Sequence, residues 1–134
     1  MRFMAIVKPG KDYEAGKPPS PELMAAMGKL NQESTAAGIF VTGGGLLPSS
    51  QGHKLRMSGG KVTVTDGPFS ETKEVIGGFA ILNYASHEEA IEGARRVMQI
   101  HADHGYTDLE IELRPMMAPG ECGAQMPQQT SAAA

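Results

Sequence analysis

The residues best suited to chemistry lie close together, between positions 66 and 74. Three carboxylates, Asp66, Glu71 and Glu74, stand around one lysine, Lys73. A carboxylate can give or take a proton at a reacting atom, and a lysine can hold an anionic group. The same residue types also form ion pairs that only fix a turn. The sequence therefore predicts catalytic carboxylates here and leaves a structural ion-pair network open as the alternative.

Three residues outside this stretch are predicted to bind a ligand. Glu112 and Arg114 stand two positions apart in an alternating segment, so they share one face of a strand. Together with Lys73, Arg114 predicts a preference for a small anionic ligand. Histidine side chains commonly act as general bases, so His53 is a candidate base. The alternatives are an exposed strand face and an ordinary loop histidine.

The turn that precedes these carboxylates carries its own signals. Asp66-Gly67 is a strong turn dipeptide, and Pro68 fixes φ and removes a donor. We expect Gly67 to need a backbone conformation that glycine adopts easily, and Phe69 to fill the core beneath the turn.

The elements that must position these side chains follow from periodicity. Apolar or alternating runs predict four strands, and Ser20 and Ser86 are typical N-caps of two amphipathic helices. The strands are expected at 3–7, 39–42, 79–84 and 109–114, the helices at 21–37 and from 87 to about Gly105, and a hairpin at 54–57 and 61–65 around Ser58-Gly59-Gly60. The glycines Gly43 to Gly45 are expected to end or bend the second strand. This order predicts an α+β fold, a ferredoxin-like split βαβ sheet with an inserted β-hairpin.

Two helices can cover only one face of such a sheet. The apolar runs at 3–7 and 79–84 imply that the other face is covered as well. A second copy of the chain is the simplest cover, so we predict a C2 homodimer with sheet facing sheet, a dimeric α+β barrel.

Composition bounds the remaining possibilities. The 134 residues suit one domain, expected at 1–117, followed by a disordered tail at 118–134. A net charge of −3 argues against nucleic-acid binding, and the sequence has no apolar run long enough for a membrane span. The one cysteine, Cys122, leaves no internal disulfide and fits a cytoplasmic location.

No metal site or cofactor is predicted. His101, Asp103 and His104 have metal-capable types, but a histidine near a helix C-terminus is favoured by the helix dipole alone. The glycines at 43–45 lack the Lys-Ser/Thr continuation of a phosphate-binding loop.

One ordered set of motifs resembles a known family. It comprises Asp66-Gly67-Pro68-Phe69, Glu71-Thr72-Lys73-Glu74, Gly77-Gly78-Phe79 and the ending Glu112-Leu113-Arg114-Pro115. Over residues 1–117 the chain resembles the DGPF subgroup of YCII-related proteins. The resemblance implies a ferredoxin-like homodimer from a bacterium, in a family whose biochemical role is mostly unassigned. Some other members use a histidine on the first helix, but residues 21–37 contain none, so that mechanism does not carry over.

Two functions follow from these predictions. One is a small-molecule-binding or regulatory module with its ligand beside the Asp66-Phe69 turn. The other is a small acid-base enzyme, lyase- or isomerase-like, that uses Asp66, Glu71 or Glu74 with Lys73 or Arg114.

Overall fold

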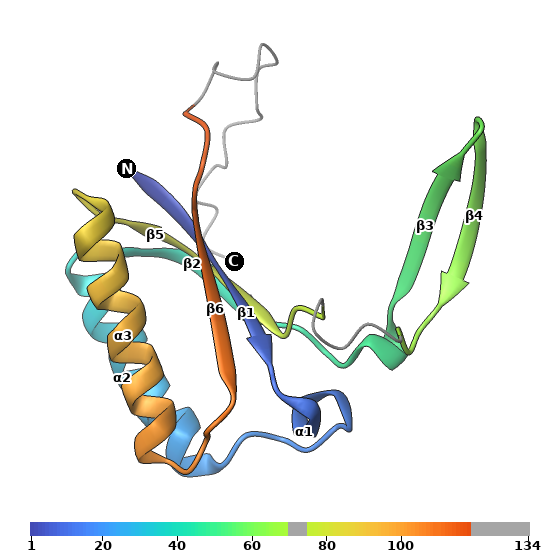
Figure 1. The fold of residues 1–134 in the computed structure, drawn as a ribbon. Coiled ribbons are helices and arrows are strands. Elements are labelled where there is room, and N and C mark those ends of the chain that lie inside the picture. The colour runs from blue at the N-terminus through green and yellow to red at the C-terminus, as the bar shows by residue number, and fades with distance from the viewer. Residues whose placement is uncertain (70–74, 119–134) are drawn as a thin grey trace.

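The computed structural model describes residues 1–69 and 75–118 of the chain. In this part a four-stranded sheet carries helices on one face, and a two-stranded hairpin stands apart from it (Figure 1). The elements in chain order are β1 (Arg2–Pro9), α1 (Lys11–Glu14), α2 (Pro21–Ala36), β2 (Phe40–Gly45), the 3-10 helix η1 (Ser49–Gln51), β3 (His53–Ser58), β4 (Lys61–Asp66), β5 (Gly78–Asn83), α3 (His87–Asp103) and β6 (Leu109–Pro115).

The sheet has the strand order β2-β5-β1-β6, and each neighbouring pair is antiparallel. Helix α2 connects β1 to β2, and α3 connects β5 to β6. In each of these β-α-β units, one strand of the other unit lies between the two strands. The predicted α+β class is confirmed.

Both long helices begin where the sequence predicts. The Ser20 hydroxyl oxygen accepts a hydrogen bond from the Leu23 N–H at 3.2 Å, and Ser86 accepts one from the Glu89 N–H at 3.2 Å. The Glu89 side chain in turn accepts from the Ala85 N–H at 3.1 Å. These contacts satisfy N–H groups that have no partner within the helix.

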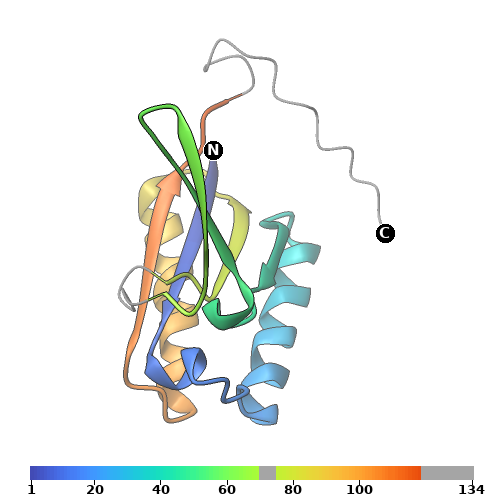
Figure 2. The ribbon, with the colours of Figure 1, turned by 90° about the vertical axis from the view of Figure 1, so that its right-hand side faces the viewer.

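The core lies between the sheet and the helices α2 and α3, which cover the same face (Figure 2). Phe3 is 1% exposed, and its ring meets the His87 ring of α3 edge-on at 5.2 Å. Leu23, Leu30 and Ala90 are buried on the helix side of this layer. Met24, an apolar residue of the same helix α2, is instead 60% exposed, so it does not belong to the buried stripe of that helix.

Strand β2 differs from the prediction at its end. It continues through Gly43 to Gly45, which pair with β5. A Cβ on Gly43 would lie 2.7 Å from the carbonyl oxygen of Phe79, so the glycine permits a close approach of two strands where we had expected a bend. Residues 11–14 form the short helix α1.

The predicted hairpin is confirmed, and we call residues 53–66, its strands β3 and β4 with their turn, the arm. Gly59 and Gly60 form the turn with φ of +57° and +80°, as a two-residue hairpin of right-handed twist requires. The arm projects away from the sheet face that the helices leave uncovered (Figures 1 and 2). Alternation gives the arm one apolar face, composed of Leu55, Met57, Val62 and Val64, and one polar face.

Among residues 1–69 and 75–118, helices of the length and apolar character that a membrane crossing requires do not occur.

Candidate functional site

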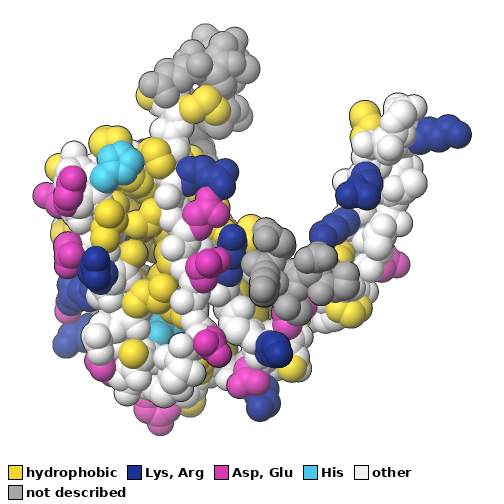
Figure 3. All heavy atoms as spheres, in the orientation of Figure 1, with side chains coloured by type: hydrophobic (Ala, Val, Ile, Leu, Met, Phe, Trp, Pro, Cys, Tyr) yellow, Lys and Arg dark blue, Asp and Glu magenta, His cyan; other side chains and the backbone are white. Residues whose placement is uncertain are grey.

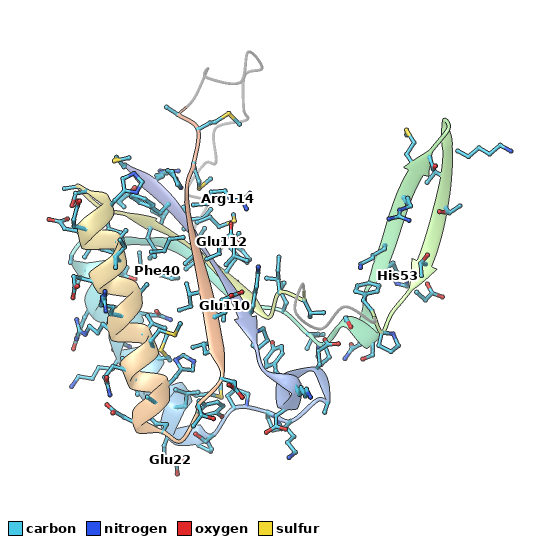
Figure 4. All side chains as sticks on the ribbon, viewed as in Figure 1. Glu22, Phe40, His53, Glu110, Glu112 and Arg114 are labelled. Atoms are coloured by element: carbon cyan, nitrogen blue, oxygen red, sulfur yellow. The ribbon has the colours of Figure 1, made fainter. Side chains whose placement is uncertain are left out.

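The predicted site residues that the structure describes lie in two separate places, and the others lie outside the described residues. Glu112 and Arg114 lie on β6, whereas His53 and Asp66 form the base of the arm (Figure 4 labels three of these four). Glu71, Lys73 and Glu74 lie outside the described residues. The structure therefore pairs the predicted residues two by two and does not gather the described ones into a single cluster.

On β6, acidic and basic side chains alternate with apolar ones and continue onto β1. We call this set the charged ladder; its members are Lys8, Glu110, Glu112 and Arg114. Strand register places Arg114 opposite Met4, Glu112 opposite Ile6 and Glu110 opposite Lys8, so all four side chains share one face of the sheet. The predicted alternation of β6, with Leu109, Ile111 and Leu113 on the other face, is confirmed.

Glu112 is the centre of the ladder. Arg114 donates to its Oε2 from Nε at 2.8 Å and also from Nη2. Lys8 Nζ lies 3.7 Å from Glu112 Oε1 and 3.5 Å from Glu110 Oε2. The hydrogen bond from Arg114, with the nearby positive charges of Arg114 and Lys8, lowers the pKa of the Glu112 carboxyl against a smaller opposing effect of burial. The ladder holds two positive and two negative groups, so it is formally neutral as it stands.

Beside the ladder lies an apolar surface that the helices do not cover. Met4 and Ile6 of β1 and Phe79 of β5 are half-buried, and register places them on the ladder's face of the sheet. We call this face, with the ladder at its β6 edge, the open face. It combines an apolar floor with charged groups along one side.

At the base of the arm, His53 Nδ1 and Asp66 Oδ1 lie 2.7 Å apart. Both side chains are exposed, 63% and 79% respectively. A carboxylate at Nδ1 orients the ring and leaves Nε2 to exchange a proton with a ligand. The sequence pointed to both residues for different reasons, and strand register brings them together as the first cross-strand pair of the arm.

A junction between α1, η1 and the segment that follows β4 anchors the arm to the body. The Glu14 carboxylate accepts from the Ser49 N–H at 2.7 Å and from the Ser49 hydroxyl at 2.5 Å, and the Ser49 oxygen accepts from the Phe69 N–H at 3.1 Å. Ser49 is 6% exposed. We call Glu14, Ser49 and Phe69 the junction.

The junction corrects two expectations about the turn. Gly67 does not have a positive φ; glycine is needed because a Cβ there would lie 1.7 Å from the Ser49 carbonyl oxygen. Phe69 does not fill the core, since its half-buried ring lies 4.4 Å below the Lys54 ammonium.

Two surface hollows of about 600 Å³ lie elsewhere. One is lined by Met1, Ile39, Tyr84 and three glutamates of α3, and the other lies between α3 and the apolar side chains of β6. Neither includes a predicted site residue. Burial raises the pKa of the Tyr84 hydroxyl, with a smaller contribution from Glu89 and an opposing one from Arg96.

The helix-end histidines are used within their own helix. His101 Nδ1 lies 2.8 Å from the Val97 carbonyl oxygen, and His104 Nδ1 lies 2.7 Å from that of Ile100. Among the described residues, groups of three or more His, Cys, Asp or Glu that could hold a metal ion do not occur.

Sequence reasoning missed Lys8 and Glu110 of the ladder, and Glu14 and Ser49 of the junction. Lys8 follows Met4 and Ile6 at intervals of two, which was the available signal, but the unbroken apolar run hid the alternation. Glu14 and Ser49 are 35 residues apart and carry no local signal of their contact.

Comparison with known proteins places these features in a family. The model of the YCII-related domain matches residues 1–112. An uncharacterized protein of Rhizobium meliloti (strain 1021) is 38% identical over 78 residues, which cover 57% of this chain. The match spans about 60% of that relative's length.

Proposed function

Because the chain belongs to the YCII-related family, whose domain covers residues 1–112, we propose that it is a small-molecule-binding or regulatory module that acts as a homodimer. The ligand class we infer is a small amphipathic anion. Its apolar part would lie on the open face and its anionic group at Arg114.

The proposal extends to the subgroup and the assembly. The Asp66-Gly67-Pro68-Phe69 motif supports membership of the DGPF subgroup. The strand order β2-β5-β1-β6, with interleaved β-α-β units, supports a ferredoxin-like fold that pairs into a dimeric α+β barrel. The single cysteine supports a cytoplasmic location, and we propose a bacterial source on the resemblance.

One observation carries the binding proposal: an exposed arginine stands at the edge of a half-buried apolar surface. The Arg114 side chain is 69% exposed. Its guanidinium carries five donor hydrogens, and the bonds to Glu112 come from Nε and Nη2 alone, so donors remain for a second carboxylate or a phosphate. Met4, Ile6 and Phe79 would contact the apolar part of the same ligand.

Calorimetry with carboxylates of increasing chain length, from acetate to hexanoate, tests this proposal. Affinity should rise with chain length, because each added methylene buries more apolar surface. Arg114→Gln should weaken binding by about tenfold or more, the effect of losing one charged hydrogen-bonding partner. The matched control is Arg95→Gln, which removes an equally exposed arginine from α3 and should leave affinity unchanged.

Absence of binding by the wild-type protein would contradict the proposal. Equal weakening by Arg114→Gln and Arg95→Gln would contradict the proposal too, because the loss of affinity would then follow from the change in net charge and not from a contact with Arg114.

The His53–Asp66 pair supports a second candidate function, a small acid-base enzyme of lyase or isomerase type. In this candidate His53 is the general base, its ring oriented by Asp66 at 2.7 Å. The sequence predicts Asp66 as a catalytic carboxylate; in this candidate it is a positioning residue, which orients His53. The predicted roles of Glu71, Glu74 and Lys73 remain proposals.

Proton exchange tests this candidate without a known substrate. A general base that reaches a carbon acid replaces its C–H with C–D in D₂O, which proton NMR detects in a panel of keto acids. Exchange should occur with the wild-type protein, stop with His53→Gln and slow with Asp66→Asn. Exchange that persists in His53→Gln would exclude His53 as the base.

A further inference from the structure

We infer that the arm of each chain lies across the open face of a second copy, so that the partner's arm closes the ligand site. The inference deepens the proposed function and rests on its homodimer. It refines the proposed barrel in one respect: over Met4, Ile6 and Phe79 of one copy, the cover is the partner's arm with Leu55, Met57, Val62 and Val64, and the apolar part of the ligand lies between these two sets.

The apolar face of the arm has little cover within its own chain. Leu55, Met57, Val62 and Val64 are 56–72% exposed, and they are cross-strand neighbours on the same face. A two-stranded hairpin alone in water is marginally stable at best. Such an arm therefore needs a surface to pack on, and in this structure it projects away from its own sheet (Figure 1).

The junction holds the arm in that position. The Gly67 N–H donates to the Gly52 carbonyl oxygen at 2.9 Å, and Ser49 links Glu14 to the backbone of Phe69. These contacts fix the arm base against the body on both sides of the hairpin. The open face of the same chain is left for another molecule.

Charge selects a second copy over an arm-to-arm pairing. The arm carries Lys54, Arg56 and Lys61 against one carboxylate, Asp66, a net charge of +2. Since the whole chain has a net charge of −3, the rest of it carries −5. Basic side chains spread along the arm, whereas acidic and basic side chains alternate along the β6 edge, where the ladder is formally neutral (Figure 3). Two arms repel each other, whereas an arm is attracted to another copy's body.

Size is consistent with a specific interface. Fully burying a Val, Leu or Met hides roughly 100 Å² of apolar surface, so the four exposed arm residues present roughly 250 Å². Two arms and the sheet surface that they cover make roughly 1,000 Å², the area at which specific interfaces begin.

Length is consistent too. Strands of six residues extend about 20 Å, whereas four strands spaced about 4.8 Å apart span about 15 Å, so an arm can cross the sheet.

The arrangement also makes the ligand site a shared one. His53 and Asp66 lie on the same arm face as Leu55 and Val64, because alternation repeats every two residues. Docking of this face carries the His53–Asp66 pair to the border of the partner's open face. The apolar floor and Arg114 then come from one copy, and the cover comes from the other.

Sedimentation velocity over a range of protein concentrations tests the inference with matched variants. Leu55→Ser with Val64→Ser changes one opposed pair on the apolar face. Thr63→Ser with Thr65→Ser places two serines on the polar face of β4. Neither change alters net charge, and all four positions are exposed, so circular dichroism should show a folded body in both variants.

We expect a wild-type dimer at micromolar concentration. The apolar-face variant should have a dissociation constant raised at least about 100-fold, because each dimer loses four buried apolar side chains, and the polar-face variant should stay within about threefold of wild type. Added salt should raise the wild-type constant, since it screens the attraction between arm and body.

A monomeric wild type, or equal dissociation constants for the two variants, would overturn the inference. If the apolar-face variant remains dimeric and still binds carboxylates through Arg114, the arm interface fails while the proposed function stands. If the arm results hold and carboxylates do not bind, the proposed function fails and the interface remains.

Discussion

Along β1, the two faces of the sheet leave apolar residues in different surroundings. Phe3 and Ala5 on the helix side are 1% and 7% exposed, whereas Met4 and Ile6, their neighbours on β1, are only half-buried. The arm extends the contrast, since Leu55 and Met57 are 70% and 72% exposed. The helix-covered face therefore holds the most deeply buried residues of β1, whereas the apolar side chains of the arm have little cover within one chain. Apolar content alone therefore does not indicate where a chain buries itself.

The largest loss of stability that we expect comes from comparing a buried residue of the sheet with an exposed residue of the arm. Phe3→Ala should lower the free energy of unfolding by about 3–5 kcal/mol, because it removes a fully buried ring. Leu55→Ala should change the stability of the monomer by only about 0.5 kcal/mol, because the side chain is exposed there. Urea denaturation at a concentration that keeps both proteins monomeric measures the pair. Similar losses would erase the distinction between the two regions.

The junction holds the base of the exposed arm, yet its own residues are packed against the body. Gly67→Ala should destabilise the protein by about 1–3 kcal/mol, since the added Cβ would meet the Ser49 carbonyl oxygen. Gly44→Ala is the control: it has open space for a Cβ and no positive φ. Thermal melts should show a clear loss for the first and little change for the second. An unchanged melting temperature for Gly67→Ala would mean that the arm base is not packed as described.

The smallest expected effect is a pH-dependent change in stability at Glu112, in the charged ladder at the edge of the open face. Because its folded-state pKa lies below the ordinary value of 4.5, Glu112 stabilises the fold above about pH 4.5 and loses that contribution as pH falls through the lowered pKa. Wild type and Glu112→Gln should therefore differ in melting temperature near neutral pH and converge in acid. A difference that stays constant across this range would show that the charge of Glu112 is not what matters.

Features set by local chemistry were predicted well from the sequence. Ser20 and Ser86 cap the helices, and the Gly59-Gly60 turn closes the arm, because a cap or tight turn is decided by a few adjacent residues. The α+β class followed from the succession of these elements. The alternation of Leu109 to Arg114 also gave the correct face for Glu112 and Arg114.

Features set by distant contacts were not predicted. The extension of β2 through Gly43 depends on the approach of Phe79, and the need for Gly67 depends on Ser49. Lys8 joins the ladder only because β1 pairs with β6, which its own neighbourhood does not reveal. The sequence named His53 and Asp66 separately, and only strand register made them a pair.

Amide hydrogen exchange of the arm at low and high protein concentration tests whether the sheet of a second copy covers the arm, because it observes residues 53–66 themselves. We expect rapid exchange in β3 and β4 where the protein is monomeric and strong protection where it is dimeric, while β1 is protected in both. Rapid exchange of the arm in a sample that is dimeric by mass would contradict it, because the partner's sheet would then leave the arm uncovered.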